Sequence, residues 1–239
     1  MKWIIVTRIR EWYVIFAVGV FLTIAMLAGM LQPLLSTTAT GPNKIQPIFH
    51  GNVAEPKVAF ACNVFWGEEF LPDMLQTLAA NNIHITFFIG GSWAKKYPEL
   101  LADMAAKGHE LGNHTYTHPH PNAISKEKNK EQIQKTEDLV KEITGVKTTL
   151  YAPPYGEYND MVLSAANELG YTSIMWSIDT IDWKRPPADV LKSRVTKKLH
   201  NGAIILMHPT EPTAKALPAL IKEINQAGYT ISTVSDILK

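Results

Sequence analysis

Histidines and a carboxylate stand where short apolar runs of this sequence end, a pattern typical of a hydrolytic or metal site. His114 and His118 are four positions apart, so a helical turn or a tight loop would aim both imidazoles at one metal ion. His208 directly follows the apolar run 203–207, and Asp182 follows an earlier apolar run. These residue types carry acid–base chemistry and metal ligation. For the histidine pair alone, two unrelated surface histidines are the alternative interpretation.

The elements that must position these side chains follow from hydrophobic periodicity. From Lys57 onward, short apolar runs alternate with longer amphipathic stretches. The runs predict strands at 58–62, 83–89, 109–112, 148–152, 172–176, 203–207 and 230–234. The stretches between them predict helices at 71–80, 98–107, 125–143, 160–169, 188–199 and 214–227. Such alternation predicts an α/β fold with a mostly parallel sheet and outer helices, in which chemistry is expected at the carboxyl ends of the strands.

The first part of the chain predicts a membrane anchor. Residues 12–31 carry no charge, and at about 1.5 Å per residue they reach about 30 Å, the thickness of a bilayer core. Three basic residues and one acidic residue lie in residues 1–11, so the positive-inside rule predicts a cytoplasmic flank and an exported remainder. A cleaved signal peptide and a buried core helix are the alternatives. The predicted organisation is a flank at 1–11, an anchor at 12–31, a linker at 32–55 and a domain at 56–239, placed at the plasma membrane with the domain extracytoplasmic.

Composition excludes several protein classes. The 239 residues are 46% apolar and 19% charged with a net charge of +1, which argues against a disordered chain and against a nucleic-acid partner. Residues 1–43 have a balance of +2 and residues 44–239 a balance of −1. A single cysteine, Cys62, forms no intramolecular disulfide. We expect it to be a small buried residue of the first strand, with a reactive thiolate as the alternative.

Several motifs, taken in order, resemble the polysaccharide deacetylase family, the NodB-homology carbohydrate esterases. They are Thr-Phe-Phe-Ile (86–89), Gly-His-Glu-Leu-Gly-Asn-His (108–114), Pro-Pro-Tyr-Gly (153–156), Asp-x-x-Asp-Trp (179–183) and Leu-Met-His (206–208). The resemblance covers Lys57 to Leu238. With the predicted anchor and Trp66-Gly67, the layout is similar to sporulation or cell-wall deacetylases of Gram-positive bacteria. It implies a distorted (β/α)7 barrel that uses a divalent metal, often zinc, to remove acetyl groups from N-acetylated cell-wall glycan.

The resemblance also implies roles for the residues that follow the strands. It assigns metal ligation to His114 and His118. It assigns general-acid protonation of the leaving amine to His208, with Asp182 as the carboxylate that orients this imidazole. In the family, an Asp of the first strand is the general base and a second Asp is the third metal ligand.

The walls of the implied acetyl site come from three further residues. The double proline before Tyr155 fixes a rigid loop, and the resemblance implies that the backbone N–H of Tyr155 helps to hold the oxyanion. Trp183 and Leu206 are implied to form the apolar walls around the acetyl methyl group.

The sequence departs from the family pattern at the positions that matter most for catalysis. The family motif Thr-Phe-Asp-Asp is replaced by residues 61–64, Ala-Cys-Asn-Val. Asn63 stands at the general-base position, and an amide does not take up a proton near neutral pH. Val64 stands at the third-ligand position, and Ala152 replaces the Arg that pairs with the base. Loss of a general base typically costs a factor of about 10²–10⁴ in rate.

Two carboxylates close to the altered motif are candidates for a substitute. Gly67 would let the loop turn so that Glu68 or Glu69 reaches the site. The alternative is that both are first-turn acids favoured by the helix dipole.

Function therefore stays open at the level of sequence. One hypothesis is a membrane-anchored, metal-dependent deacetylase of peptidoglycan or a chitin-like glycan, impaired by Asn63, Val64 and Ala152. The other is a non-catalytic glycan-binding or regulatory protein on the same barrel. A scaffold protein using the charged helix 125–143 is a third possibility without further support, because such a charge run is ordinarily a solvated face.

Overall fold

The computed structural model describes residues 44–239 without interruption and, before them, positions 12–14, 16–17, 20, 22–23 and 26. The chain divides into two compact units, Met1–Lys44 and Ile45–Lys239. The described positions between 12 and 26 are helical. The predicted flank at 1–11 and most of the predicted anchor at 12–31 lie outside the described residues. Among the residues that are described, no helix has the length and apolar character needed to span a bilayer.

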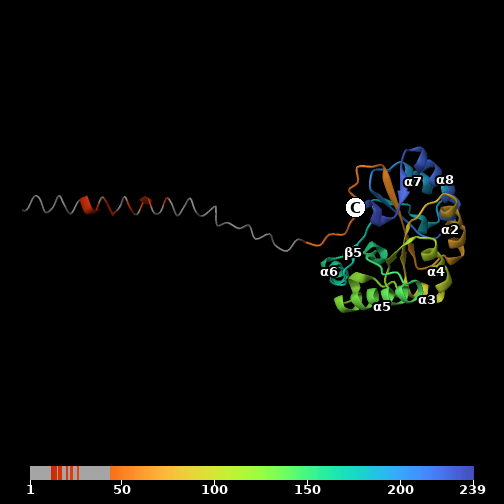
Figure 1. The fold of residues 1–239 in the computed structure, drawn as a ribbon, viewed down its shortest axis with the longest axis horizontal. Helices are drawn as coiled ribbons and strands as arrows, with labels where there is room; N and C mark the ends of the chain where they lie inside the picture. The colour runs from red at the N-terminus through yellow and green to blue at the C-terminus, as the bar shows by residue number, and fades with distance from the viewer. Residues whose placement is uncertain (1–11, 15, 18–19, 21, 24–25, 27–43) are drawn as a thin grey trace, which may run out of the picture. The chain divides into compact units, whose positions relative to one another are not determined.

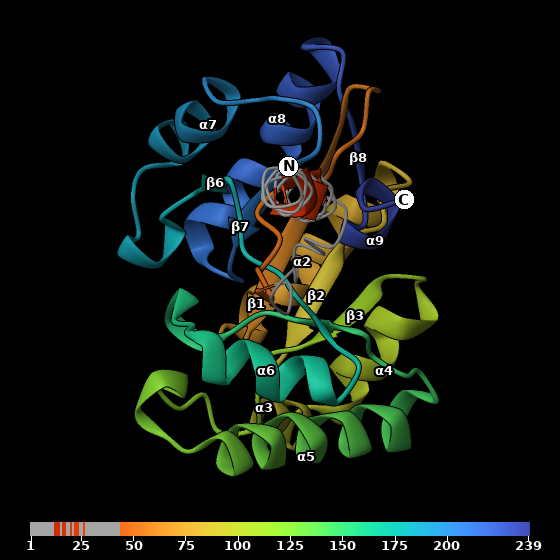
Figure 2. The ribbon, with the colours of Figure 1, turned by 90° about the vertical axis from the view of Figure 1, so that its left-hand side faces the viewer.

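One parallel sheet forms the centre of the second unit (Figure 1). Its strands are β1 (Lys57–Val64), β2 (Thr86–Ile89), β3 (Glu110–Asn113), β4 (Leu150–Tyr151), β5 (Thr172–Ser173), β6 (Ile178–Asp179), β7 (Ala203–Met207) and β8 (Thr230–Ser232). They pair in the order β5-β4-β3-β2-β1-β7-β6, and β8 pairs with the first residues of β1. Figure 2 shows β6, β7, β1, β2 and β3 side by side, in agreement with this order.

The predicted α/β fold of the NodB type is confirmed, but the barrel is open on one side. The edge strands β5 and β6 do not pair with each other. The backbone between them pairs elsewhere, because Ile174 forms a bridge with Ile48 and the N–H of Ser177 donates to Ile204 O. The sheet is therefore a curled half-barrel rather than a closed seven-stranded barrel. The predicted strand at 172–176 is shorter in the structure, where β5 ends at Ser173, and β6 was not predicted.

Side chains of β1 alternate between two apolar clusters. Val58, Phe60, Cys62 and Val64 pack against the helices, whereas Ala59 and Ala61 face the concave side. This alternation is the period of two that a strand imposes. It places Asn63, the next residue on the concave side, at the carboxyl end of the central strand.

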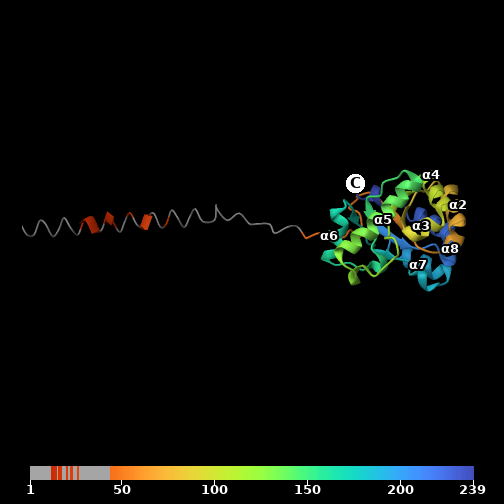
Figure 3. The ribbon, with the colours of Figure 1, turned by 90° about the horizontal axis from the view of Figure 1, so that it is seen from below.

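Helices cover the outer face of the sheet. They are α2 (Leu71–Ala80), α3 (Gly91–Lys96), α4 (Pro98–Ala106), α5 (Lys126–Thr144), α6 (Asp160–Glu168), α7 (Ala188–Thr196) and α8 (Glu211–Gln226). The short α9 (Val234–Ile237) instead packs on the concave side, in the cluster of Ala59 and Ala61. Six of the helices match the predicted helices within a few residues. α3 and α9 were not predicted, because segments of six and four residues carry too little periodicity. Figure 3 shows α5 on the outside next to α3, α4 and α6.

A short strap before β1 lies across the start of the sheet. His50 forms an antiparallel bridge with Ala203, and the N–H of Gly51 donates to Gly202 O at 2.7 Å. Gly202 has a φ of +73°, and a Cβ there would lie 2.2 Å from Gly51 O. Only a glycine permits this close approach of the two backbones.

Gly202→Ala is expected to destabilise the domain more than Gly145→Ala. Both glycines have a φ of +73°, but no atom lies within 4 Å of a Cβ built on Gly145. Gly145→Ala should lower the free energy of unfolding by about 1–2 kcal/mol from backbone strain alone. Gly202→Ala should lower it further, because the strap backbone at Gly51 must also move away from the new Cβ. Urea unfolding of the two purified variants measures the difference. Equal losses would mean that the strap does not hold this end of the sheet.

Candidate active site

The predicted site residues meet in one cavity at the carboxyl ends of the strands. Seven of them are among the residues that line a cavity of about 500 Å³: Asn63, His114, His118, Tyr155, Trp183, Leu206 and His208. The eighth, Asp182, is fully buried and is bonded to His208. Phe65, Trp66, Gly156, Trp176 and Asp179 complete the lining. The geometry therefore gathers all eight residues, while their individual roles remain predictions.

The histidine pair converges at the end of β3. His114 is buried, and its Nδ1 lies 2.7 Å from Ala152 O, so Nδ1 carries the hydrogen and donates to this carbonyl. The other ring nitrogen, Nε2, lies 3.1 Å from Nε2 of His118. Two imidazole nitrogens thus point toward the same small volume beside the cavity.

Both imidazoles are held in the neutral form. Burial and, to a smaller extent, the neighbouring His118 lower the pKa of His114 to about 3. Burial also lowers the pKa of His118 to about 4. At neutral pH the pair therefore offers lone pairs rather than positive charge.

A second histidine site lies at the end of β7. Asp182 accepts three hydrogen bonds: from the His208 N–H at 2.6 Å, from His208 Nδ1 at 2.8 Å and from Thr213 Oγ1 at 2.6 Å. These donors satisfy a carboxylate that has no exposed surface. Because Nδ1 faces Asp182, Nε2 of His208 is directed to the cavity that His208 lines. The indole of Trp66 stacks on the imidazole at 5.6 Å and 8°.

The central strand contributes a neutral floor. Asn63 is 6% exposed, and its Oδ1 is buried without a hydrogen-bond partner. Ala152, which stands where the family has Arg, is buried in the concave apolar cluster. Val64 packs on the opposite face, in the apolar cluster under the helices, and does not line the cavity. The position of the expected third ligand thus lacks a donor atom and also points away from the histidine pair.

The residues present do not fit the three-ligand metal site that the resemblance implies. The described residues contain no group of three or more His, Cys, Asp or Glu side chains that could hold a metal ion. Zinc usually takes at least three protein ligands. His114 and His118 provide two of them, so no reaction step is assigned to a metal here.

Neither of the candidate substitute carboxylates reaches the cavity. Glu68 accepts a hydrogen bond from the Tyr97 hydroxyl, and both Glu68 and Glu69 lie in a 3-10 turn before α2. This hydrogen bond lowers the pKa of Glu68. Asp179 is the carboxylate that does line the cavity; burial raises its pKa, and its Oδ1 accepts the Ile181 N–H at 2.7 Å. Cys62 is fully buried on the helix side, as predicted.

Aromatic rings form the mouth of the cavity. Tyr155 is 56% exposed with a φ of 59°, and the His120 imidazole stacks on its ring at 4.0 Å. Trp183 is 51% exposed, whereas Leu206 is buried deeper in the wall. Flat rings at a partly open mouth are suited to stacking on the apolar faces of a sugar.

Buried polar side chains of α5 hold the histidine loop. Gln132 Oε1 accepts from the N–H groups of Tyr116 and Thr117 at 3.0 and 2.7 Å, and Asn129 Nδ2 donates to Pro121 O at 2.9 Å. The charge run of this helix predicts a solvated face, and the structure shows a buried polar face as well. The missed signal is that Asn129, Gln132, Thr136 and Glu137 share the helical face of Ile133 and Val140.

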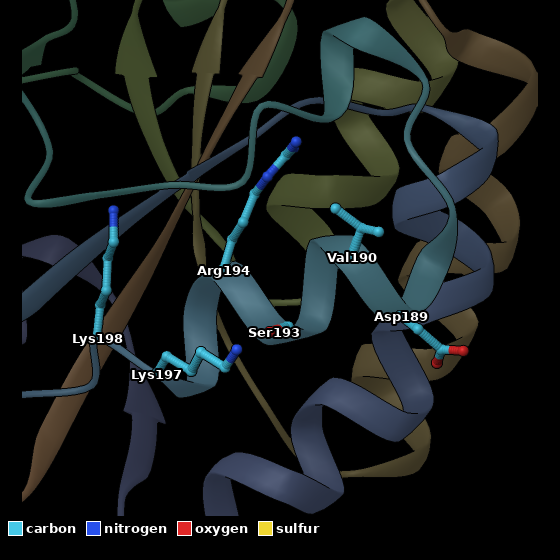
Figure 4. Close-up of a pocket in the computed structure, with 6 residues that line it drawn as sticks. All are labelled: Asp189, Val190, Ser193, Arg194, Lys197 and Lys198. Carbon is cyan, nitrogen blue, oxygen red and sulfur yellow. The ribbon is translucent and has the colours of Figure 1, made fainter.

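Arg194 of α7 holds the loop that carries Asp182, and sequence reasoning missed it as well. Its guanidinium donates to Thr180 O at 2.7 Å and to Ile181 O at 3.3 Å. Figure 4 shows the side chain extending from α7, one turn before Lys197 and Lys198. Ile181 has a φ of 51°, a strained conformation that such bonds help to maintain.

The family model described as polysaccharide deacetylase matches residues 50–174 of this chain. The chain belongs to the polysaccharide deacetylase family. Its similarity to the YlxY protein of Bacillus subtilis is 42% identity over 193 residues, which is 81% of the chain and 60% of that protein. The chain therefore spans less than two thirds of this relative. It is also 32% identical to a peptidoglycan-N-acetylglucosamine deacetylase of Bacillus cereus over 176 residues, 72% of the chain and 64% of that enzyme.

Solved structures of this family include proteins described as pseudoenzymes. A CE4-family pseudoenzyme of Bacillus anthracis is 38% identical, with a TM-score of 0.79 over 81% of this chain and 69% of that one. A mutant of the same protein, described as having restored enzymatic activity, fits with the same TM-score. The polysaccharide deacetylase fold of this chain thus has both enzymes and pseudoenzymes among its neighbours.

The free energy of unfolding is expected to fall as the pH falls from 6.5 toward 4. Unfolded histidines have a pKa of about 6.5, whereas folded His114 and His118 have values of about 3 and about 4. The unfolded chain binds more protons in this range, so acid favours unfolding. Urea unfolding with EDTA at pH 7 and pH 5 measures the loss. His118→Gln should reduce the loss and the exposed-residue control His120→Gln should not; an unchanged loss in His118→Gln would contradict the assignment.

Arg194→Ala should destabilise the chain by about 1.5–3 kcal/mol, the contribution of hydrogen bonds from a charged group. The reason is that Thr180 O and Ile181 O lose their donor and the Asp182 loop loosens. Lys198→Ala is the matched control, because Lys198 is an exposed cation that lines the same shallow surface hollow as Arg194, and this change should be near neutral. Thermal unfolding and the imidazole NMR signals of His208 report both effects. Similar losses in the two variants would exclude a specific role for Arg194.

Proposed function

We propose that this chain binds the N-acetyl groups of cell-wall glycan, such as peptidoglycan or a chitin-like polymer, without hydrolysing them. Asn63 carries this proposal. It occupies the general-base position at the floor of the cavity, is uncharged and is 6% exposed. An amide does not take the proton of an attacking water near neutral pH, so the general-base position at the floor of the cavity no longer supplies a base.

The same asparagine is suited to an intact acetamido group. Asn63 Oδ1 is a buried acceptor without a partner, and an acetamido N–H is a neutral donor that would satisfy it. A cavity of about 500 Å³ is large enough for one sugar residue, and the Trp183 and Tyr155 rings at its mouth offer stacking surfaces. The neutral form of His114 and His118 keeps positive charge out of the floor.

The family neighbours support a non-catalytic function. A pseudoenzyme of the same fold is 38% identical to this chain, and a mutant of it is described as having regained activity. The chain spans 60% of its YlxY relative, so we propose, rather than carry over from that relative, the activity and partners of the whole protein. The proposal places the domain outside the plasma membrane, anchored by residues 12–31, since the balance of +2 before residue 44 favours a cytoplasmic N-terminus.

A slow deacetylase is the second candidate. The hydrogen-bonded pair of His208 and Asp182 favours it, because this is the arrangement of a general acid with its orienting carboxylate. On this hypothesis His114 and His118 hold a divalent ion, zinc for example, through two protein ligands. Such a site would be weaker than a three-ligand one.

Binding and hydrolysis are separated by one experiment. The purified chain should bind tetra-N-acetylchitotetraose in calorimetry with zinc or with EDTA, and should release no acetate above a protein-free blank. The double variant Asn63→Asp, Ala152→Arg with zinc should release acetate at least about 10² times faster than the unchanged chain, since a lost base costs a factor of about 10²–10⁴ in rate. Val64 is left unchanged because its side chain packs in the helix-side apolar cluster.

His208→Ala in the double-variant background is the control and should abolish the gained activity. Acetate release by the unchanged chain that disappears in His208→Ala would favour the slow deacetylase. Absence of glycan binding under all conditions would overturn the proposed function.

A further inference from the structure

Two cations, Lys184 and Arg185, lie beside the mouth of the cavity, and each contacts an aromatic ring that lines it. The Arg185 guanidinium carbon is 5.6 Å from the ring centroid of Trp66 and 5.7 Å from that of Phe70. Lys184 Nζ is 4.9 Å from the ring centroid of Trp183. Trp66 and Trp183 both line the cavity, so a positively charged side chain lies over each of these two indole rings.

The backbone fixes these cations relative to the site. Residues Asp182–Lys184 form a 3-10 turn, and the N–H of Arg185 donates to Asp182 O at 2.8 Å. Arg185 itself has a φ of 52°. The turn buries Asp182 against His208 and leaves Trp183, Lys184 and Arg185 exposed at the surface.

The carboxylates of the neighbourhood are engaged elsewhere. Among the described residues neither Lys184 nor Arg185 forms an ion pair. Glu211, whose charge interacts with Arg185, is bonded to Lys215 at 2.5 Å. Asp182 is saturated by His208 and Thr213, and Asp179 lies within the cavity wall with its Oδ1 on the Ile181 N–H.

We infer that the cavity selects N-acetylated sugars that carry a carboxylate next to the acetamido group. This inference rests on the proposed function and names its ligand class. The neutral acetamido group enters toward Asn63, and Asp179 keeps a negative charge out of the interior. The carboxylate remains at the mouth, where Arg185 and Lys184 receive it without an ion-pair partner among the described residues, since nearby Glu211 is bonded to Lys215.

N-acetylmuramic acid has this chemistry, because a lactyl ether stands on the carbon next to the one bearing the acetamido group. In cell-wall glycan the carboxylate comes from a free lactyl group or from the stem peptide that is joined to it. A neutral N-acetylglucosamine polymer has neither.

The test compares four disaccharide probes by calorimetry on the full chain: di-N-acetylchitobiose, N-acetylglucosaminyl-N-acetylmuramic acid, the methylamide of that acid, and its peptide-bearing form. A carboxylate-bearing probe should bind about two- to fivefold more tightly than the two neutral probes at low salt, as expected for partly exposed charge pairs. The advantage should shrink in 0.5 M NaCl, where the Debye length is about 4–5 Å. Comparing the acid with its peptide-bearing form shows whether the chain binds the free lactyl carboxylate or a carboxylate of the stem peptide.

Arg185→Gln should remove most of this advantage and leave chitobiose binding within about twofold, because only the charge contact is lost. Arg185→Lys should retain part of it, and Lys197→Gln, at an exposed cation directly after α7, should leave all four affinities unchanged. Equal affinity for acid and methylamide, or an advantage that survives Arg185→Gln, would overturn the inference while chitobiose binding persists. If the unchanged chain binds none of the probes, the proposed function fails first.

Discussion

The burial of charge is the constraint that shapes this site. A buried carboxylate is tolerated only when donors or cations satisfy it. Asp182 meets this condition, because His208 and Thr213 give it three hydrogen bonds. At the floor of the cavity the family's carboxylate and its arginine are both replaced, by Asn63 and Ala152. Removing only one of these charges would leave the other buried without a partner, so the joint replacement keeps the floor neutral and stable.

Distant elements hold the geometry around this neutral floor. Gln132 and Asn129 of α5 fix the histidine loop from one side, and Arg194 of α7 fixes the Asp182 loop from the other. Apart from Asn82, the described non-glycine residues with positive φ lie in loops at this edge: Thr115, His118, Tyr155, Ile181 and Arg185. Strained backbone of this kind persists where the surroundings over-determine it. The site is therefore rigid and preorganised although a general base is missing.

Much of this architecture could be predicted from sequence, and the failures have physical causes. Long periodic segments such as α2 and the strand β7 were located within a residue or two. The gathering of the motif residues followed from the rule that parallel strands end at one edge. The open side of the barrel was missed because β5 and β6 have two residues each, too few to show a period.

Long-range polar contacts were beyond sequence reasoning for a different reason. The partners of Arg194, the two carbonyls of residues 180 and 181, have no sequence signature at all. The motif comparison placed Val64 at the third-ligand position but did not show that its side chain is buried on the helix side of the strand. For α5, charged residues on one face masked the buried polar residues on the other.

The state of the acetyl group in the cavity decides between binding and catalysis. A crystal structure of the chain soaked with zinc and tetra-N-acetylchitotetraose measures it directly. We predict an intact acetamido group whose N–H lies within hydrogen-bond distance of Asn63 Oδ1, with no third protein side chain joining His114 and His118 on a metal. A free acetate beside a deacetylated sugar, or a third protein ligand on the ion, would contradict the neutral, non-catalytic floor.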